Sequence, residues 1–208
     1  GDYRGSGFEF RTDAWAVVRG GEGVLLSTHA RNRQGSGITS TQMDAAEAVS
    51  QFKNAKALAE SLTDAATQQK ALISKDADKA QSDFIEQLDP KAKGKFAGAV
   101  NGQQAVKATD GSRALDAAQP VEKFATPMVL MDSAASINLA TPASTVIYSG
   151  QQLHLTTQSD LHMTAAHTAS SVAANAANLF THSGGIQAIA GNGPVSLQAH
   201  TDQLEILA

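Results

Sequence analysis

The C-terminal part of the chain follows an eight-residue period, which restricts the fold more than any other feature of the sequence. Two apolar or small residues separated by one position recur at steps of eight and later nine, with turn-forming residues between them. Side chains alternate along a strand, so each pair points to one side and the residue between them points to the other. Each unit therefore predicts a short strand followed by a tight turn. The pairs are Ile137/Leu139, Thr145/Ile147, Leu153/Leu155, Leu161/Met163, Ala169/Ser171, Ala177/Leu179, Ile186/Ala188, Val195/Leu197 and Leu204/Ile206.

The start of the chain has the same spacing. The pattern ends near Arg31 and resumes with Met128/Leu130, which we expect to be the next inward pair, nine residues before Ile137. We therefore expect one repetitive β structure that is interrupted by an insertion. The early pairs are Phe8/Phe10, Ala16/Val18 and Val24/Leu26.

The insertion has a helical pattern. Apolar residues over 43–88 recur at steps of three and four, after a capping box at 41–44. One straight helix over 41–89 would be about 70 Å long at about 1.5 Å per residue. A break near Ser74 would instead give a helical hairpin, and the sequence permits both geometries. It also leaves two roles open for the insertion: a buttress packed on the β structure, or a platform that holds cargo. The expected organisation is first β-prism repeats in 1–31, the helical insertion with flanking linkers in 32–127, and the main β-prism repeats in 128–208.

The repeat predicts an oligomer. One eight-residue unit offers two inward apolar side chains, which are too few to bury a core, so the chain can cover its apolar edge only against copies of itself. Cyclic symmetry supplies those copies, and a three-fold axis would make each chain one side of a triangular prism. The predicted fold class is mainly β: an elongated trimeric triangular β-prism of eight- and nine-residue strand-turn repeats, with an α-helical insertion. The predicted trimer core is Phe8, Phe10, Val18, Val24, Leu26, Ile137, Leu139, Ile147, Leu153, Leu155, Leu161, Met163, Leu179, Ile186, Val195, Leu197, Leu204 and Ile206.

Composition excludes several classes of protein. The chain has 16 basic and 20 acidic residues, and every Lys and Arg lies at or before Lys123, so it is not a generic basic nucleic-acid binder. It has no run of eighteen apolar residues that would form a transmembrane helix. It has no cysteine, which excludes disulfides and thiolate nucleophiles. Aromatic residues are 5% and charged residues 17%, both low for an enzyme-sized globule.

Few residues are candidates for chemistry. Ser50 and Lys53 have the Ser-x-x-Lys spacing of serine acyl-enzymes, but the companion motifs are missing and the pair lies in the helical pattern. His154 and His162 lie one unit apart between inward residues, so we expect both to face outward as a polar ladder. His200, near the end of the chain, is the metal candidate that a three-fold axis would gather most easily, although we favour a cap or a partner contact for it. We predict no enzyme, no catalytic residues and no cofactor.

Several longer strings resemble the C-terminal region of VgrG, the spike protein of the type VI secretion machine. The resemblance implies a homotrimeric β-prism needle that extends the spike, is injected with it from the bacterial cytoplasm, and docks or carries toxic effectors. It transfers no enzymatic residue. Since the chain begins with Gly1, we expect it to be a piece without the family's preceding domains. The strings are residues 7–15, 21–28, 140–144, 185–200 and 201–202.

Two classes of function remain from the sequence. The first is a needle that helps to pierce membranes and holds an effector, its adaptor or a tip-capping protein, with no nucleic acid as partner. The second is a phage-fibre-like or adhesin-like module that binds a glycan, for which the needle offers few aromatic side chains. An unpaired last strand would invite strand addition or hydrophobic docking by a partner. The predicted partner-binding strand is Gln203, Leu204, Glu205, Ile206 and Leu207.

Overall fold

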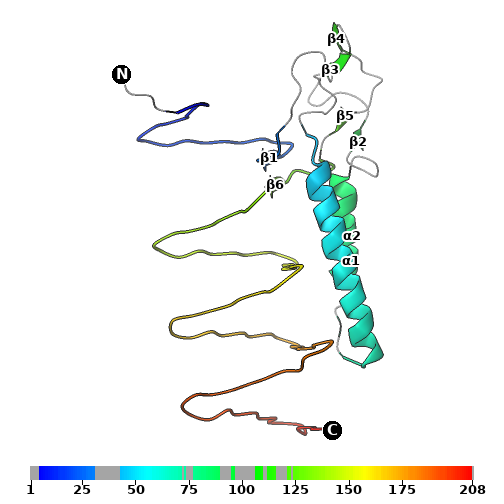
Figure 1. Cartoon of the computed structure of the whole chain (residues 1–208), viewed down its shortest axis with the longest axis vertical. Helices are drawn as coiled ribbons and strands as arrows, with labels where there is room; N and C mark the ends of the chain where they lie inside the picture. The colour runs from blue at the N-terminus through cyan, green and yellow to red at the C-terminus, as the bar shows by residue number, and fades with distance from the viewer. Residues whose placement is uncertain are drawn as a thin grey trace.

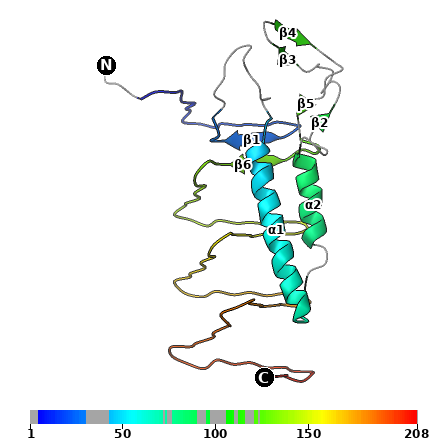
Figure 2. The same ribbon diagram turned by 45° about the vertical axis from the view of Figure 1, so that its right-hand side comes forward.

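The computed structural model consists of an extended chain with a helical hairpin beside it (Figures 1 and 2). We call residues 5–30 and 124–207 the needle, because they run back and forth across one long axis, pass after pass, with little regular secondary structure. The structure describes residues 5–30, 43–71, 73, 77–89, 95–96, 106–109, 112–115, 121–122 and 124–207.

The insertion forms a helical hairpin, which is one of the two geometries that the sequence permits. Helix α1 spans Ala46–Gln68 and α2 spans Ala77–Leu88. The two helices pack through an edge-on contact between Phe52 and Phe84, whose ring centroids are 4.9 Å apart. An ion pair between Lys53 and Asp89 also joins them.

Helix α1 begins later than the sequence predicts. Its N-cap is Ala45, which has no capping side-chain hydrogen bond, and the Asp44 carboxylate instead accepts from the Ala46 amide at 3.1 Å. The predicted start at Thr41 lies outside the described residues. The capping box would have the Asp44 carboxylate accept a hydrogen bond from the amide of residue 41. In the structure the carboxylate accepts from the Ala46 amide, at the first turn of α1.

The insertion leaves and re-enters the needle at two adjacent strands. Strand β1 (Val24–Ser27) pairs in parallel with β6 (Val129–Asp132), so that Val24 lies beside Val129 and Leu26 beside Met131. The remainder of the insertion adds two antiparallel pairs that the helical pattern did not predict. These are β2 (Lys95–Phe96) with β5 (Val121–Glu122), and β3 (Val106–Thr109) with β4 (Ser112–Leu115).

The small core lies where the hairpin meets β6. Leu130 is only 4% exposed and packs against both helices, whereas its neighbours Val129 and Met131 are exposed. The expectation that Met128/Leu130 continue the inward pairs is therefore wrong. Val129 and Met131 share the exposed side of this strand, and they lie eight residues before Ile137 and Leu139, so they keep the eight-residue step. The core cluster is Ala45, Ala48, Val49, Leu88, Phe124 and Leu130.

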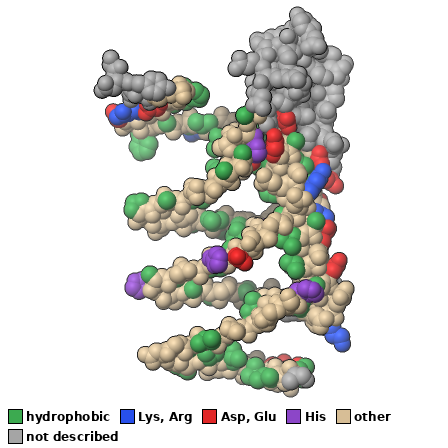
Figure 3. Space-filling model, viewed as in Figure 1, with side chains coloured by type: hydrophobic (Ala, Val, Ile, Leu, Met, Phe, Trp, Pro, Cys, Tyr) green, Lys and Arg blue, Asp and Glu red, His purple; other side chains and the backbone are tan. Residues whose placement is uncertain are grey.

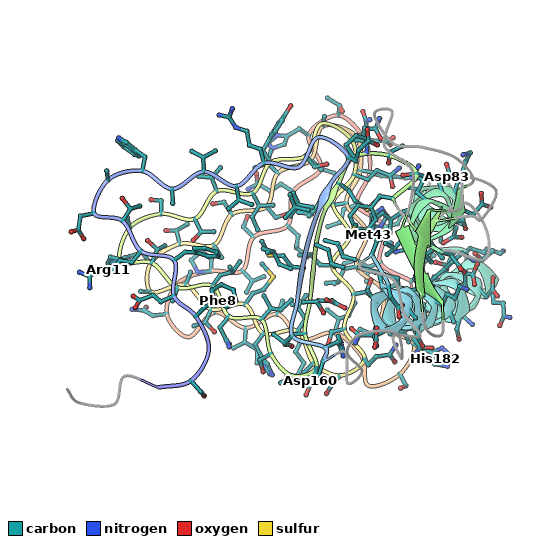
Figure 4. The ribbon with its side chains drawn as sticks, turned by 90° about the horizontal axis from the view of Figure 1, so that it is seen from above. Phe8, Arg11, Met43, Asp83, Asp160 and His182 are labelled. Carbon is teal, nitrogen blue, oxygen red and sulfur yellow. The ribbon has the colours of Figure 1, made fainter. Side chains whose placement is uncertain are left out.

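The needle returns to the hairpin after it has left it at β6. Leu130 packs on the hairpin, and 24 residues later, three eight-residue units, His154 hydrogen-bonds to Gln81 of α2 at 3.2 Å. Phe180 is half-buried, and it is the single residue of 134–207 that is not exposed. In the view from above the passes overlie one another (Figure 4). The chain therefore makes circuits, which corrects the expectation that each chain forms one side of a prism.

Residues 134–207 lack backbone pairing within the chain. Among the described residues, none of their amides donates to a backbone carbonyl. Strand pairing over the described ranges is limited to three two-stranded sheets, so a mainly β prism stays a prediction for an assembly. An extended chain without partners for its amides and carbonyls needs other strands beside it or full contact with water.

The turn before β1 supplies a prediction. Gly23 has φ +134°, and a Cβ there would lie 2.4 Å from the ring of buried Phe124 and 2.9 Å from the Met128 carbonyl oxygen. Gly23→Ala should therefore lower stability by about 1–3 kcal/mol, through backbone strain and displacement of Phe124. Gly21→Ala is the matched control, because a Cβ at Gly21 meets nothing within 4 Å. Thermal unfolding measures both; equal midpoints for the two variants would contradict this packing.

Candidate functional site

The candidate interaction surface is the row of apolar side chains along the needle. Val24 is half-buried, and every other residue of the predicted trimer core is exposed, from 51% at Leu26 to 94% at Phe10. In the space-filling view apolar side chains appear along each pass of the needle (Figure 3). A monomeric protein rarely exposes so continuous an apolar surface, so the row marks a site of interaction.

The view along the needle axis shows how one of these side chains lies. Phe8 lies within the outline that the passes trace, whereas Arg11 points away from it (Figure 4). The rings of Phe8 and Phe10 meet edge-on with centroids 5.0 Å apart. These positions agree with an apolar interior and a polar exterior for the needle.

The last described residues present a second exposed apolar edge. Leu204 is 56% exposed, Ile206 81% and Leu207 90%. On the same segment Gln203 donates a hydrogen bond from its side-chain amide to the Glu205 carboxylate at 3.0 Å. The predicted partner-binding strand therefore lies in the open, and its role stays a prediction.

A cavity of about 240 Å³ lies between α1 and the needle just after β6. Beside it, His29 Nε2 and Asp132 Oδ2 are 3.7 Å apart, and Asp132 Oδ1 is buried without a hydrogen-bond partner. Sequence reasoning missed this site, since only the parallel pairing of β1 and β6 brings His29 and Asp132 together. The lining residues are Ala48, Gln51, Phe52, Met131, Asp132, Ser133, Ala135 and Ile137.

The candidates for chemistry occupy structural positions. Lys53 is paired with Asp89, so its ammonium is held away from the role of a free base for Ser50. His154 faces α2, where its ring hydrogen-bonds with Gln81, and its expected place in an outward polar ladder stays a prediction. His162 and His200 are exposed. Within the described ranges no three His, Asp or Glu side chains gather as metal ligands.

Two family models match the chain. Residues 1–66 match a family described as a putative type VI secretion system Rhs element Vgr. Residues 116–208 match a family described as an uncharacterized protein conserved in bacteria (DUF2345). No curated protein matches the chain.

Two solved structures share the fold over 99% of the chain. One is described as the structure of the Tle1 effector bound to the VgrG spike from the Type 6 secretion system, with 23% identity and a TM-score of 0.76. The other is described as the VgrG spike from the Type 6 secretion system, with 24% identity and a TM-score of 0.74. The chain covers 52% and 63% of those chains, so it spans little more than half of their length. The chain is therefore similar to the type VI secretion Vgr family over residues 1–66, and it shares its fold with two VgrG spike structures.

Proposed function

We propose that three copies of the chain wind around one axis and complete a triangular β-prism. The chain returns to the hairpin after 24 residues, three units of eight, as a path over three faces requires. Between two passes of one chain, strands of the two other copies would pair with the amides and carbonyls of residues 134–207, which have no backbone partner within their own chain. The same arrangement would enclose the exposed odd-numbered pairs, such as Leu153/Leu155, around the axis.

The completed prism would serve as the needle of a type VI secretion spike. The observation that carries this function is the apolar row of residues 134–207, which has no backbone pairing, in a chain that shares its fold with VgrG spike structures. A narrow object in which every strand is paired is rigid along its axis and hard to unfold, so force from behind can push it through a target membrane. It would be made in the bacterial cytoplasm and then injected. Neither described helix is long and apolar enough to span a membrane.

The needle would also carry an effector. One solved structure with the same fold is bound to an effector, and this chain offers two places for such a partner. The first is the exposed segment 203–207, where a partner could add a strand or cover Leu204, Ile206 and Leu207. The second is the outer side of the hairpin. The function needs no catalytic residue, no metal and no cofactor.

An interior charge should abolish the needle. Leu155→Asp would place three carboxylates around the axis without partners, so the copies should fail to assemble. Thr156→Asp is the matched control, since residue 156 points to the opposite side of the same strand. We expect light scattering to give three times the 21.5 kDa chain mass for wild type and Thr156→Asp, and a smaller mass for Leu155→Asp.

The same pair of variants tests the function in cells. In a bacterium that fires this spike, Leu155→Asp should stop killing of competitor cells, and Thr156→Asp should keep it. Normal killing and a trimeric mass for Leu155→Asp would contradict both the prism and its role.

Removal of the last strand tests the partner site. Deletion of residues 203–208 should leave the trimer intact and reduce delivery of the effector at least tenfold, because it removes the exposed apolar edge. Killing of competitor cells reports delivery, and the mass in solution reports assembly. Unchanged killing would place the effector elsewhere, with the hairpin as the remaining site.

A further inference from the structure

Two large apolar side chains lie on the outer side of the needle. Val146 is 84% exposed and Tyr148 is 89% exposed. Both are even-numbered, as are Leu130 and His154, which face the hairpin of their own chain. Val146 and Tyr148 lie sixteen residues after Leu130 and Asp132, two units of the period, so they face a different side of the prism. Nothing described in their own chain covers them.

Three-fold symmetry determines where these residues lie relative to the other copies. If a chain returns to one face after three units, the two strands stacked between its passes come from the two other copies, displaced by one unit and by two. The strands beneath β6 on the hairpin face are then residues 137–140 of one neighbour and 145–148 of the other. On this face the outward side chains would stack in two columns along the needle. The first column is Leu130, Asn138, Val146 and His154. The second is Asp132, Ala140, Tyr148 and Thr156.

We propose that the helical hairpin of each copy docks on Val146 and Tyr148 of a neighbouring copy and thereby clamps the three chains together. The proposal rests on the proposed three-chain needle and names the surface that the hairpin covers. Each hairpin would hold its own chain at Leu130 and His154, with one strand of each neighbour between these two levels. The contact is heterologous and closes after three copies.

The hairpin has an open apolar site at the level that this docking requires. Phe52 is 36% exposed and lines the cavity together with Gln51. The cavity lies next to the end of β6, and the adjoining Asn54 accepts a hydrogen bond from Gln158 of the needle at 3.3 Å. The ring of Phe52 thus lies between two contacts of the hairpin with its own needle. Aromatic and aliphatic side chains of a neighbouring strand would fill this space.

The buried carboxylate beside the cavity also needs a partner from outside the chain. The Asp132 side chain is almost fully buried, with 5% of its surface exposed, and its Oδ1 atom has no hydrogen-bond partner among the described residues. In the stacked order, Asn138 of a neighbouring copy passes directly beneath Leu130, and its amide group carries two donors. An unsatisfied buried carboxylate oxygen is costly, and an incoming amide would remove that cost.

Cross-linking tests the docking directly, because the chain has no cysteine of its own. The variant Phe52→Cys with Tyr148→Cys, treated with a short bismaleimide, should give covalent dimers and trimers on a denaturing gel, since each hairpin would reach a neighbour. Gln51→Cys with Tyr148→Cys repeats the test without removing the Phe52–Phe84 contact, so it stays informative if the first variant loosens the hairpin. We expect more than half of the chains to be cross-linked in either variant.

The matched control pairs Phe52→Cys or Gln51→Cys with Val172→Cys. Val172 is 95% exposed, points outward as Tyr148 does, and lies one full circuit of 24 residues later. It should give at least tenfold less cross-linked product. A trimeric mass without cross-links to residue 148, or equal cross-linking to residues 148 and 172, would overturn the docking while the needle remains. A monomeric mass would overturn the docking and the needle together.

Discussion

The unpaired backbone of residues 134–207 is the constraint on which the structure depends. Amides and carbonyls that pair neither with each other nor with water are costly, and the described residues of this segment form no backbone hydrogen bond among themselves. The segment nevertheless keeps a regular path, since it returns to the hairpin at His154 and Gln158 and its passes overlie one another (Figure 4). A regular path without internal pairing is what one strand of an interleaved assembly requires. The exposed apolar side chains also favour assembly. Burial of this row against other copies would be the main favourable contribution to the free energy of assembly.

The hairpin contacts the needle where the insertion leaves it and re-enters it. Between β1 and β6 the chain leaves the needle, and the parallel pairing of these strands lets it return to the same face. Leu130 and Phe124 then attach the helices to the needle, and Gln81 and Asn54 touch it again farther along. In the proposed assembly these contacts would hold the strands of other copies between them. The insertion would therefore be a clamp, which favours the buttress over the free platform.

Much of the architecture was predictable, because periodicity reports directly on side-chain direction. The eight-residue spacing identified the needle, and the three-four spacing of 43–88 identified the helices. Leu130 was misassigned because an apolar residue that packs on a helix looks the same in sequence as one that faces an axis. The start of α1 was also missed, since the residue at the N-cap is Ala45, whose side chain cannot cap a helix. The meeting of His29 and Asp132 had no signal in the sequence, because it depends on strand pairing across the whole insertion.

Hydrogen exchange of the needle amides is the most direct test of the central claim. If three chains interleave, the amides of 137–206 pair with strands of other copies, so we predict exchange at least a thousandfold slower than in an unstructured peptide, with the bends as exceptions. The two helices provide an internal reference, because their amides are paired within the chain. Protection over the needle comparable to that of α1 would support the interleaved prism. Protected helices beside a needle that exchanges at the rate of an unstructured peptide would contradict it.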